Sequence, residues 1–237
     1  MSDPGAWLTP AEAEALWLSL KTGLAGTALS LPPGIAIAWG LARRNFPGKI
    51  VLDGLVHLPL VLPPVVTGYL LLVLFGHGGA IGQFLERGFG LTVAFNWKGA
   101  ALASAVMGFP LLVRAIRLAF EAVDPKLEAA ARTLGAGPAD VFMSVTLPLI
   151  TPGLIAGALL GFARALGEFG ATITFVANIP GETQTLPLAL YSALQVPGGE
   201  IDAARFVLLS LVLAIAALGA SEYFARAMRR RIGGAAQ

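Results

Sequence analysis

The chain contains five apolar stretches that are each long enough to cross a lipid bilayer. A spanning helix needs roughly 20 predominantly apolar residues. Only 13% of the 237 residues are charged, against about a quarter in a soluble globular domain, and the mean hydropathy is +0.77. The sequence therefore predicts an all-α, polytopic membrane protein with a single transmembrane domain over residues 1–237. The five expected spans are 16–41, 50–75, 99–120, a run that starts after Pro148 and Pro152 and continues to 176, and 204–224.

Prolines interrupt the first two of these spans. A proline inside a helix removes one backbone hydrogen bond and clashes with the preceding turn, which kinks or breaks the helix. Pro32 and Pro33 lie within the first span, so we expect a kink or break there. A membrane tolerates such a break where neighbouring helices or a cavity satisfy the freed carbonyls. The second span is not expected to be one straight helix, because it contains Pro59, Pro63 and Pro64.

The fourth span has small residues at regular helical spacing. Gly153, Gly157 and Gly161 recur every four residues, which places them on one face of a helix. Small side chains on one face let a neighbouring helix approach closely in a membrane. We therefore expect this face to be a packing surface.

Two segments between the spans are expected outside the membrane. Residues 76–98 are rich in glycine and indicate an external loop that includes one amphipathic turn. Residues 177–203 form a second external segment, in which 186–194 is apolar but too short to span a bilayer. The sequence leaves open whether 186–194 re-enters the membrane from outside.

The basic residues predict how the chain is oriented. Cytoplasmic segments of membrane proteins carry an excess of Lys and Arg. Three segments that fall on one side of the expected spans hold most of these residues, whereas the outer segments between spans hold only Arg87 and Lys98. We therefore expect the N-terminus outside and the C-terminus in the cytoplasm. The basic residues on the inner side are Arg43, Arg44, Lys49, Arg114, Arg117, Lys126, Arg132, Arg226, Arg229, Arg230 and Arg231.

Several function classes are excluded by what the sequence lacks. There is no cysteine, so a thiolate metal site or a cysteine nucleophile cannot exist. No GxxxxGK[ST] nucleotide-binding loop and no cluster at metal-ligand spacing is present. A net charge of +2 does not indicate nucleic-acid binding. The chain by itself is not expected to be an enzyme or to hold a metal or cofactor, and His57 is interpreted as a packing or cytoplasmic-side polar residue.

A polar stretch over about 121–148 separates the third and fourth spans. Asp124 and Pro125 form a helix start, and good helix formers follow as far as Leu134. Gly135 and Gly137 are expected to end this helix, because glycine adopts the left-handed conformation easily. Pro138 and Asp140 then start a second short helix. The pattern predicts two short cytoplasmic helices joined by a glycine elbow.

This stretch resembles the EAA loop of ABC-type importer permeases. In that family a Glu-Ala-Ala triplet is followed at fixed spacing by Gly and then by Leu-Pro. Here Gly135 and the Leu147-Pro148 pair fall at the family spacing, Ala129 occupies the position of the family Glu, and Glu128 lies one residue earlier. The resemblance implies a loop that couples the membrane domain to an ATPase. Its residues are Glu128, Ala129, Ala130, Ala131, Gly135, Leu147 and Pro148.

Four further segments resemble the molybdate permease subunits of such importers. These are FPGK (46–49), LPLVLPPVVTGYLLL (58–72), ARALGEFGATITFVANIPGET (163–183) and PGGE (197–200). The resemblance implies a type I ABC importer permease fold and transport of molybdate, and also tungstate, across the inner membrane of a prokaryote. It implies a homodimer, two cytoplasmic subunits that bind ATP and Mg, and an external molybdate-binding protein. Sulfate and other oxyanion permeases are near relatives of this group.

Two charged residues, Arg164 and Glu168, lie one helical turn apart in the fourth span. Arg164 could attract an oxyanion in the translocation path, since arginine suits bidentate recognition of such groups. The two residues could instead form an internal ion pair that orients the span. We favour the ion pair, because Glu168 would repel an anion.

Two other classes of membrane protein were compared with the importer hypothesis. An ion-coupled secondary transporter should show broken helices in two related halves, and no such duplication is found. A membrane-embedded enzyme needs a cluster of catalytic residues at one depth. Only the importer hypothesis explains a polar loop with a glycine elbow.

Overall fold

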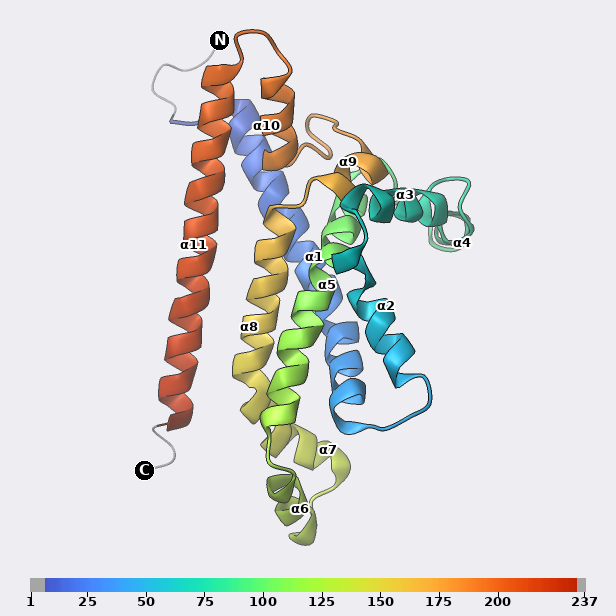
Figure 1. Ribbon diagram of the computed structural model, residues 1–237, viewed down its shortest axis with the longest axis vertical. Coiled ribbons are helices and arrows are strands. Elements are labelled where there is room, and N and C mark those ends of the chain that lie inside the picture. Colours follow the sequence, from blue (N-terminus) through green and yellow to red (C-terminus); the bar gives the residue numbers. More distant parts are fainter. Residues whose placement is uncertain (1–6, 234–237) are drawn as a thin grey trace.

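The computed structural model describes residues 7–233, with the side chains of 221, 222 and 224–233 left out. Every regular element in this range is a helix, as the sequence predicts (Figure 1). The elements are α1 (Pro10–Arg43), α2 (Lys49–Val61), α3 (Pro64–Phe75), α4 (Ala80–Phe89), α5 (Trp97–Ala122), α6 (Pro125–Thr133), α7 (Pro138–Val141), the π-helix η1 (Phe142–Thr146), α8 (Leu147–Leu166), α9 (Gly170–Val176), α10 (Leu186–Leu194) and α11 (Glu200–Gly233).

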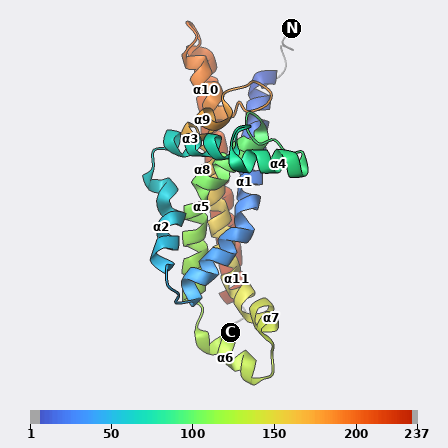
Figure 2. The same ribbon diagram turned by 90° about the vertical axis from the view of Figure 1, so that its right-hand side faces the viewer.

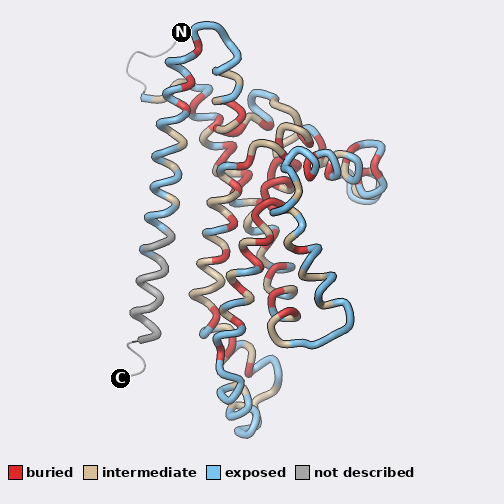
Figure 3. The backbone as a smooth tube through the Cα atoms, in the orientation of Figure 1, coloured by how far each residue is buried: buried red, intermediate tan, exposed pale blue. Residues whose placement is uncertain are grey.

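Three long helices, α1, α5 and α8, form the centre of the bundle. The helices α11 and α2 lie on opposite sides of this centre, and α3 and α4 run across the bundle axis (Figures 1 and 2). Buried residues concentrate along α5, whereas most of the described part of α11 is exposed or half-buried (Figure 3). The helix α5 is therefore the element around which the others pack.

The predicted number of spans agrees with the described helices. Four helices are long and apolar enough to cross a membrane, and the count becomes five if the bent pair α2 and α3 is one span. This pair is bent by 115°. The break lies at Leu62 and Pro63, so the expectation that prolines prevent one straight helix is confirmed. The long spanning helices are Pro10–Arg43, Trp97–Ala122, the combined segment Pro138–Leu166, and Glu200–Ala220.

The break considered at Pro32 and Pro33 does not occur. The helix α1 continues through both prolines to Arg43. The buried residues Ser30 and Gly34 flank the two prolines. A Cβ atom added at Gly34 would meet the side chain of Leu112, so α1 is held closely against α5 at this point. Tertiary packing on both sides of the prolines keeps the helix continuous.

The glycine face of the fourth span packs as predicted. A Cβ atom added at Gly157 would lie 3.0 Å from the carbonyl oxygen of Leu112 in α5. One added at Gly108 of α5 would lie 2.8 Å from the carbonyl oxygen of Gly161. On the other side of α5, a Cβ at Gly26 of α1 would lie 2.6 Å from the carbonyl oxygen of Ala101. Backbone therefore meets backbone along both faces of α5, which larger side chains would prevent.

The predicted end of the fourth span was wrong. The helix α8 ends at Leu166, and after a three-residue break α9 begins at Gly170. The side chain of Glu168 accepts a hydrogen bond from the backbone N–H of Ala171 at 2.8 Å. A carboxylate that satisfies a free N–H at a helix start stabilises that start, so the polar residue divides an apolar run into two helices.

The two outer segments are more structured than predicted. Residues Ala80–Phe89 form the ten-residue helix α4 in place of one amphipathic turn. Residues Leu186–Leu194 form α10, which packs beside α11 and α1 with Leu186 and Leu188 buried (Figure 1).

The start of α1 and the end of α11 lie at opposite ends of the bundle, as the five-span orientation requires (Figure 1). The turn at 44–48 and the helices α6 and α7 lie at the same end as the C-terminal part of α11 (Figure 1). This places the basic segments that are described on one side. The side chains of Arg226, Arg229, Arg230 and Arg231 lie outside the described residues.

The orientation can be tested by labelling, because the natural chain contains no cysteine. We expect Asn45→Cys and Ala139→Cys to react with a membrane-impermeant thiol reagent only after cells are opened. We expect Gly88→Cys and Gln195→Cys to react in cells whose inner membrane is intact but whose outer envelope has been made permeable. All four positions are exposed. Labelling of Ala139→Cys before the cells are opened would contradict the orientation.

Candidate ATPase-coupling loop and ion pairs

The helix α6 extends beyond the ends of the long helices (Figure 2). The side chain of Asp124 caps it by accepting a hydrogen bond from Lys126 N at 2.9 Å, and Pro125 occupies its first turn, as predicted. No residue of α6 is buried. Leu127 and Leu134 are 49% and 89% exposed, so the loop presents apolar side chains to the exterior.

The glycine elbow follows α6 directly. Gly135 has φ of +88°, and nothing lies within 4 Å of a Cβ added there. Glycine is required at this position by the backbone angle, and not by crowding. The N–H of Gly137 donates to the carboxylate of Asp140 at 3.3 Å, and Pro138 begins α7. The predicted helix, elbow and second helix are all present.

Glu128 lies at the inner surface of the loop and contacts two other elements. The Nη2 atom of Arg43, in the last turn of α1, lies 3.2 Å from Glu128 Oε1. The hydroxyl of Thr146, at the end of η1, donates to the same oxygen at 2.9 Å. Ala129, at the position of the family Glu, is exposed. The acidic residue one position earlier, Glu128, makes the ion pair with Arg43, and no pattern in the sequence indicates Arg43 or Thr146 as its partners.

The Leu147-Pro148 pair forms the start of α8. It follows directly on the π-helix η1, in which the N–H of Leu147 donates to the carbonyl of Phe142. Pro148 is the second residue of α8 and lies inside the combined helical segment Pro138–Leu166, where it has no N–H to donate to the preceding turn. Leu147 packs against the core cluster that includes Ile150 and Phe120. The Leu147-Pro148 pair joins the loop to the apolar core, as the sequence predicted.

Ala130 and Ala131 lie on α6, between Glu128 and the elbow at Gly135.

Arg164 and Glu168 form the ion pair that the sequence favoured. Arg164 Nη1 lies 2.8 Å from Glu168 Oε2. The side chain of Glu168 is 1% exposed and that of Arg164 is 27% exposed. Since Glu168 also caps α9 through Ala171, the pair holds the break between α8 and α9 in place. A role for Arg164 toward an anion stays a hypothesis.

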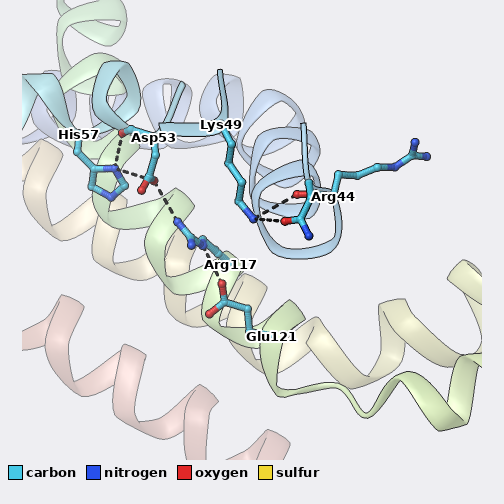
Figure 4. Close-up of polar contacts among 7 residues, drawn as sticks. Arg44, Lys49, Asp53, His57, Arg117 and Glu121 are labelled. Atoms are coloured by element: carbon cyan, nitrogen blue, oxygen red, sulfur yellow. Dashed lines mark hydrogen bonds and ion pairs between the residues drawn. The ribbon is translucent and has the colours of Figure 1, made fainter. Parts of the chain in front are cut away.

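A second polar cluster joins α2 to α5 (Figure 4). Arg117 Nη1 lies 3.1 Å from Asp53 Oδ1, and Arg117 Nε lies 2.8 Å from Glu121 Oε1. His57 Nδ1 lies 2.8 Å from the carbonyl oxygen of Asp53, which agrees with its interpretation as a packing or cytoplasmic-side polar residue. The sequence did not indicate this cluster, because Asp53 and Arg117 are far apart along the chain.

No metal site is found among the side chains that the structure describes, where no three His, Cys, Asp or Glu residues come close enough to hold an ion. The arrangement offers a projecting loop, polar ties at the helix ends and an apolar bundle.

The comparisons with known proteins agree with this arrangement. The chain is 60% identical over 226 residues to the "Molybdenum transport system permease protein ModB" of Escherichia coli K12, a match that covers 95% of this chain and 99% of that protein. It is 43% identical over 162 residues to the "Sulfate transport system permease protein CysT" of Salmonella typhimurium, with 68% of this chain and 58% of that protein covered.

Solved structures share the fold. A chain from the crystal structure of a "bacterial alginate ABC transporter in complex with alginate pentasaccharide-bound periplasmic protein" has a TM-score of 0.71 and 17% sequence identity, with 95% of this chain and 81% of that chain covered. The sequence pattern of one protein family matches residues 32–230. By this match and the 60% identity, the chain belongs to the family described as "Binding-protein-dependent transport system inner membrane component".

Proposed function

We propose that the chain is the membrane-spanning permease subunit of an ATP-driven importer that carries molybdate, and also tungstate, across the cytoplasmic membrane of a prokaryote. The observation that carries this proposal is the 60% identity to a molybdenum permease over 95% of the chain. The projecting loop with its elbow at Gly135 supports it, because such a loop suits contact with a cytoplasmic ATPase.

In this proposal ATP and Mg are bound by two partner ATPase subunits, and the permease supplies the path. Closure of the ATPases moves α6 and so biases the bundle between inward-facing and outward-facing states. An external molybdate-binding protein delivers the substrate to the outer face. The complex contains two copies of this chain, because five spans do not readily enclose a path alone. The exposed apolar side chains of α2 are available to lipid or to a second copy, and they include Ile50, Val51, Leu55 and Val61.

Selectivity is expected to lie upstream of the permease. Molybdate, tungstate and sulfate share charge and shape and differ mainly in size. A rigid binding protein separates them by size, because hydrogen bonds set for one radius leave unpaired groups at another. Sulfate is the second candidate substrate, and the 43% identity to a sulfate permease is the observation that favours it.

Uptake by the reconstituted complex tests the proposed substrate. The complex of this chain, its ATPase and its own binding protein, placed in lipid vesicles, should accumulate labelled molybdate only when ATP is present. Unlabelled tungstate should compete strongly and sulfate weakly. Vesicles without the binding protein serve as the control. Uptake of labelled sulfate without uptake of molybdate would transfer the assignment to the sulfate permeases.

The ion pair of Arg164 and Glu168 can be separated from a role in the path by a double variant. Arg164→Ala leaves a buried carboxylate unpaired, a loss of about 3–5 kcal/mol for a buried pair, so the yield of assembled complex should fall sharply. Adding Glu168→Gln removes the charge but keeps an oxygen that accepts from Ala171 N–H, so it should restore most of the yield and the uptake. A double variant that assembles normally but does not transport would instead assign Arg164 to the anion path.

A further inference from the structure

We propose that Arg43, Glu128 and Thr146 form a clamp that ties the coupling helix α6 to the inner ends of α1 and α8, and that this clamp transmits ATPase motion to the membrane bundle. The inference rests on the proposed function, since it names the positioning residues by which that function is coupled to ATP. We call this set the Glu128 clamp.

The position of α6 against the bundle depends on polar contacts, because apolar packing does not hold this helix. None of its nine residues is buried. At its C-terminal end the chain passes into the elbow at Gly135, where φ is +88° and no atom lies within 4 Å of an added Cβ. If α6 were held only through its two chain connections, a force applied by the ATPase would rotate the helix. The displacement would then not be transmitted to the bundle.

Side chains from α1 and η1 both contact one carboxylate oxygen of α6, Glu128 Oε1. Arg43 Nη2 lies 3.2 Å from Glu128 Oε1 and donates to the carbonyl oxygen of Val123, just before α6, also at 3.2 Å. Thr146 Oγ1 donates to the same Glu128 oxygen at 2.9 Å. The side chains of Arg43 and Glu128 are 18% and 17% exposed, and Thr146 is buried. Charge-assisted hydrogen bonds are stronger than neutral ones, so contacts from two elements at one carboxylate oxygen restrain α6 in angle as well as in position.

The hydroxyl of Thr146 differs from comparable hydroxyls in the long helices. Thr22, Ser30 and Thr151 each donate to the carbonyl four residues earlier in their own helix. Thr146 ends the π-helix η1, where hydrogen bonds run to the fifth residue back, and its hydroxyl donates to Glu128. Single π-turns inside helices occur frequently at functional sites. Here the wider turn precedes α8 and presents a hydroxyl to the coupling helix.

The clamp lies next to a buried hydrophobic cluster in the inner half of the bundle. Just above Arg43 in α1, Leu41 is fully buried in a cluster that also contains Phe120 of α5 and Ile150 of α8. Close-packed interiors transmit displacement because they have few voids to absorb it. A displacement of α6 at Glu128 is therefore carried to α1 through Arg43 and to α8 through Thr146.

A pair of variants at Thr146 tests the clamp. Thr146→Val keeps the shape but removes the hydroxyl, and Thr146→Ser keeps the hydroxyl. In vesicles with the complete complex and molybdate-loaded binding protein, molybdate imported per ATP hydrolysed should fall about fivefold in Thr146→Val, the scale of one hydrogen bond, and stay near the natural value in Thr146→Ser. Complex yield and thermal midpoint should be alike in both.

Arg43→Ala should lower the same ratio, whereas Arg44→Ala is the matched control. Arg44 is the next residue and lies over the ring of Trp39 at 4.9 Å, with no contact to α6 among the described interactions. An unchanged ratio in both Thr146→Val and Arg43→Ala would overturn the clamp. Loss of assembly in Thr146→Val and Arg43→Ala, with normal assembly in Thr146→Ser and Arg44→Ala, would also overturn the clamp. The contacts would then serve assembly and not coupling. Failure of the natural complex to import molybdate would instead overturn the proposed function.

Discussion

The rest of the structure depends on one requirement, that backbone N–H and C=O groups inside a bilayer bond to one another. Helices satisfy this within each segment, so the described chain is helical wherever it is regular. The helices then pack through small residues, and backbone meets backbone where Gly26 and Gly157 face α5. The two breaks in the spanning helices are stabilised locally. Pro63 precedes α3, and the carboxylate of Glu168 satisfies the start of α9.

The candidate coupling loop lies outside the apolar bundle, and polar side-chain contacts hold it in place of apolar packing. Outside the bilayer α6 has no buried residue, so its position depends on charge-assisted contacts from Glu128 to Arg43 and Thr146. Similar ties join other helix ends, such as Arg205 to Glu12 at 2.9 Å between α11 and α1. The apolar interior supplies the bulk of the packing, and these polar ties determine how one helix end is placed against another. The proposed import requires both, because the bundle must move as one body and α6 must keep its position against the helix ends.

Local patterns in the sequence predicted much of this arrangement, and contacts between distant residues could not be predicted. The spans, the elbow at Gly135 and the packing face at Gly157 follow from hydropathy, backbone preference and helical spacing. The partner of Glu128 did not follow, because Arg43 is 85 residues away and no pattern links the two. Of the kink or break expected at Pro32 and Pro33, the break does not occur, because α1 packs closely against α5 there. The end of α8 was missed because Glu168 bonds the start of a new helix inside an apolar run.

In the proposed importer, the arrival of loaded binding protein at the outer face is coupled through this chain to ATP hydrolysis by the partner subunits. The most direct measurement is the ATP hydrolysis rate of the purified complex in lipid, recorded as molybdate-loaded or empty binding protein is added. We predict that the rate rises and saturates with the loaded binding protein and stays near its basal value with the empty one. A rate that does not respond to the loaded protein, in a complex shown to be fully assembled, would contradict it.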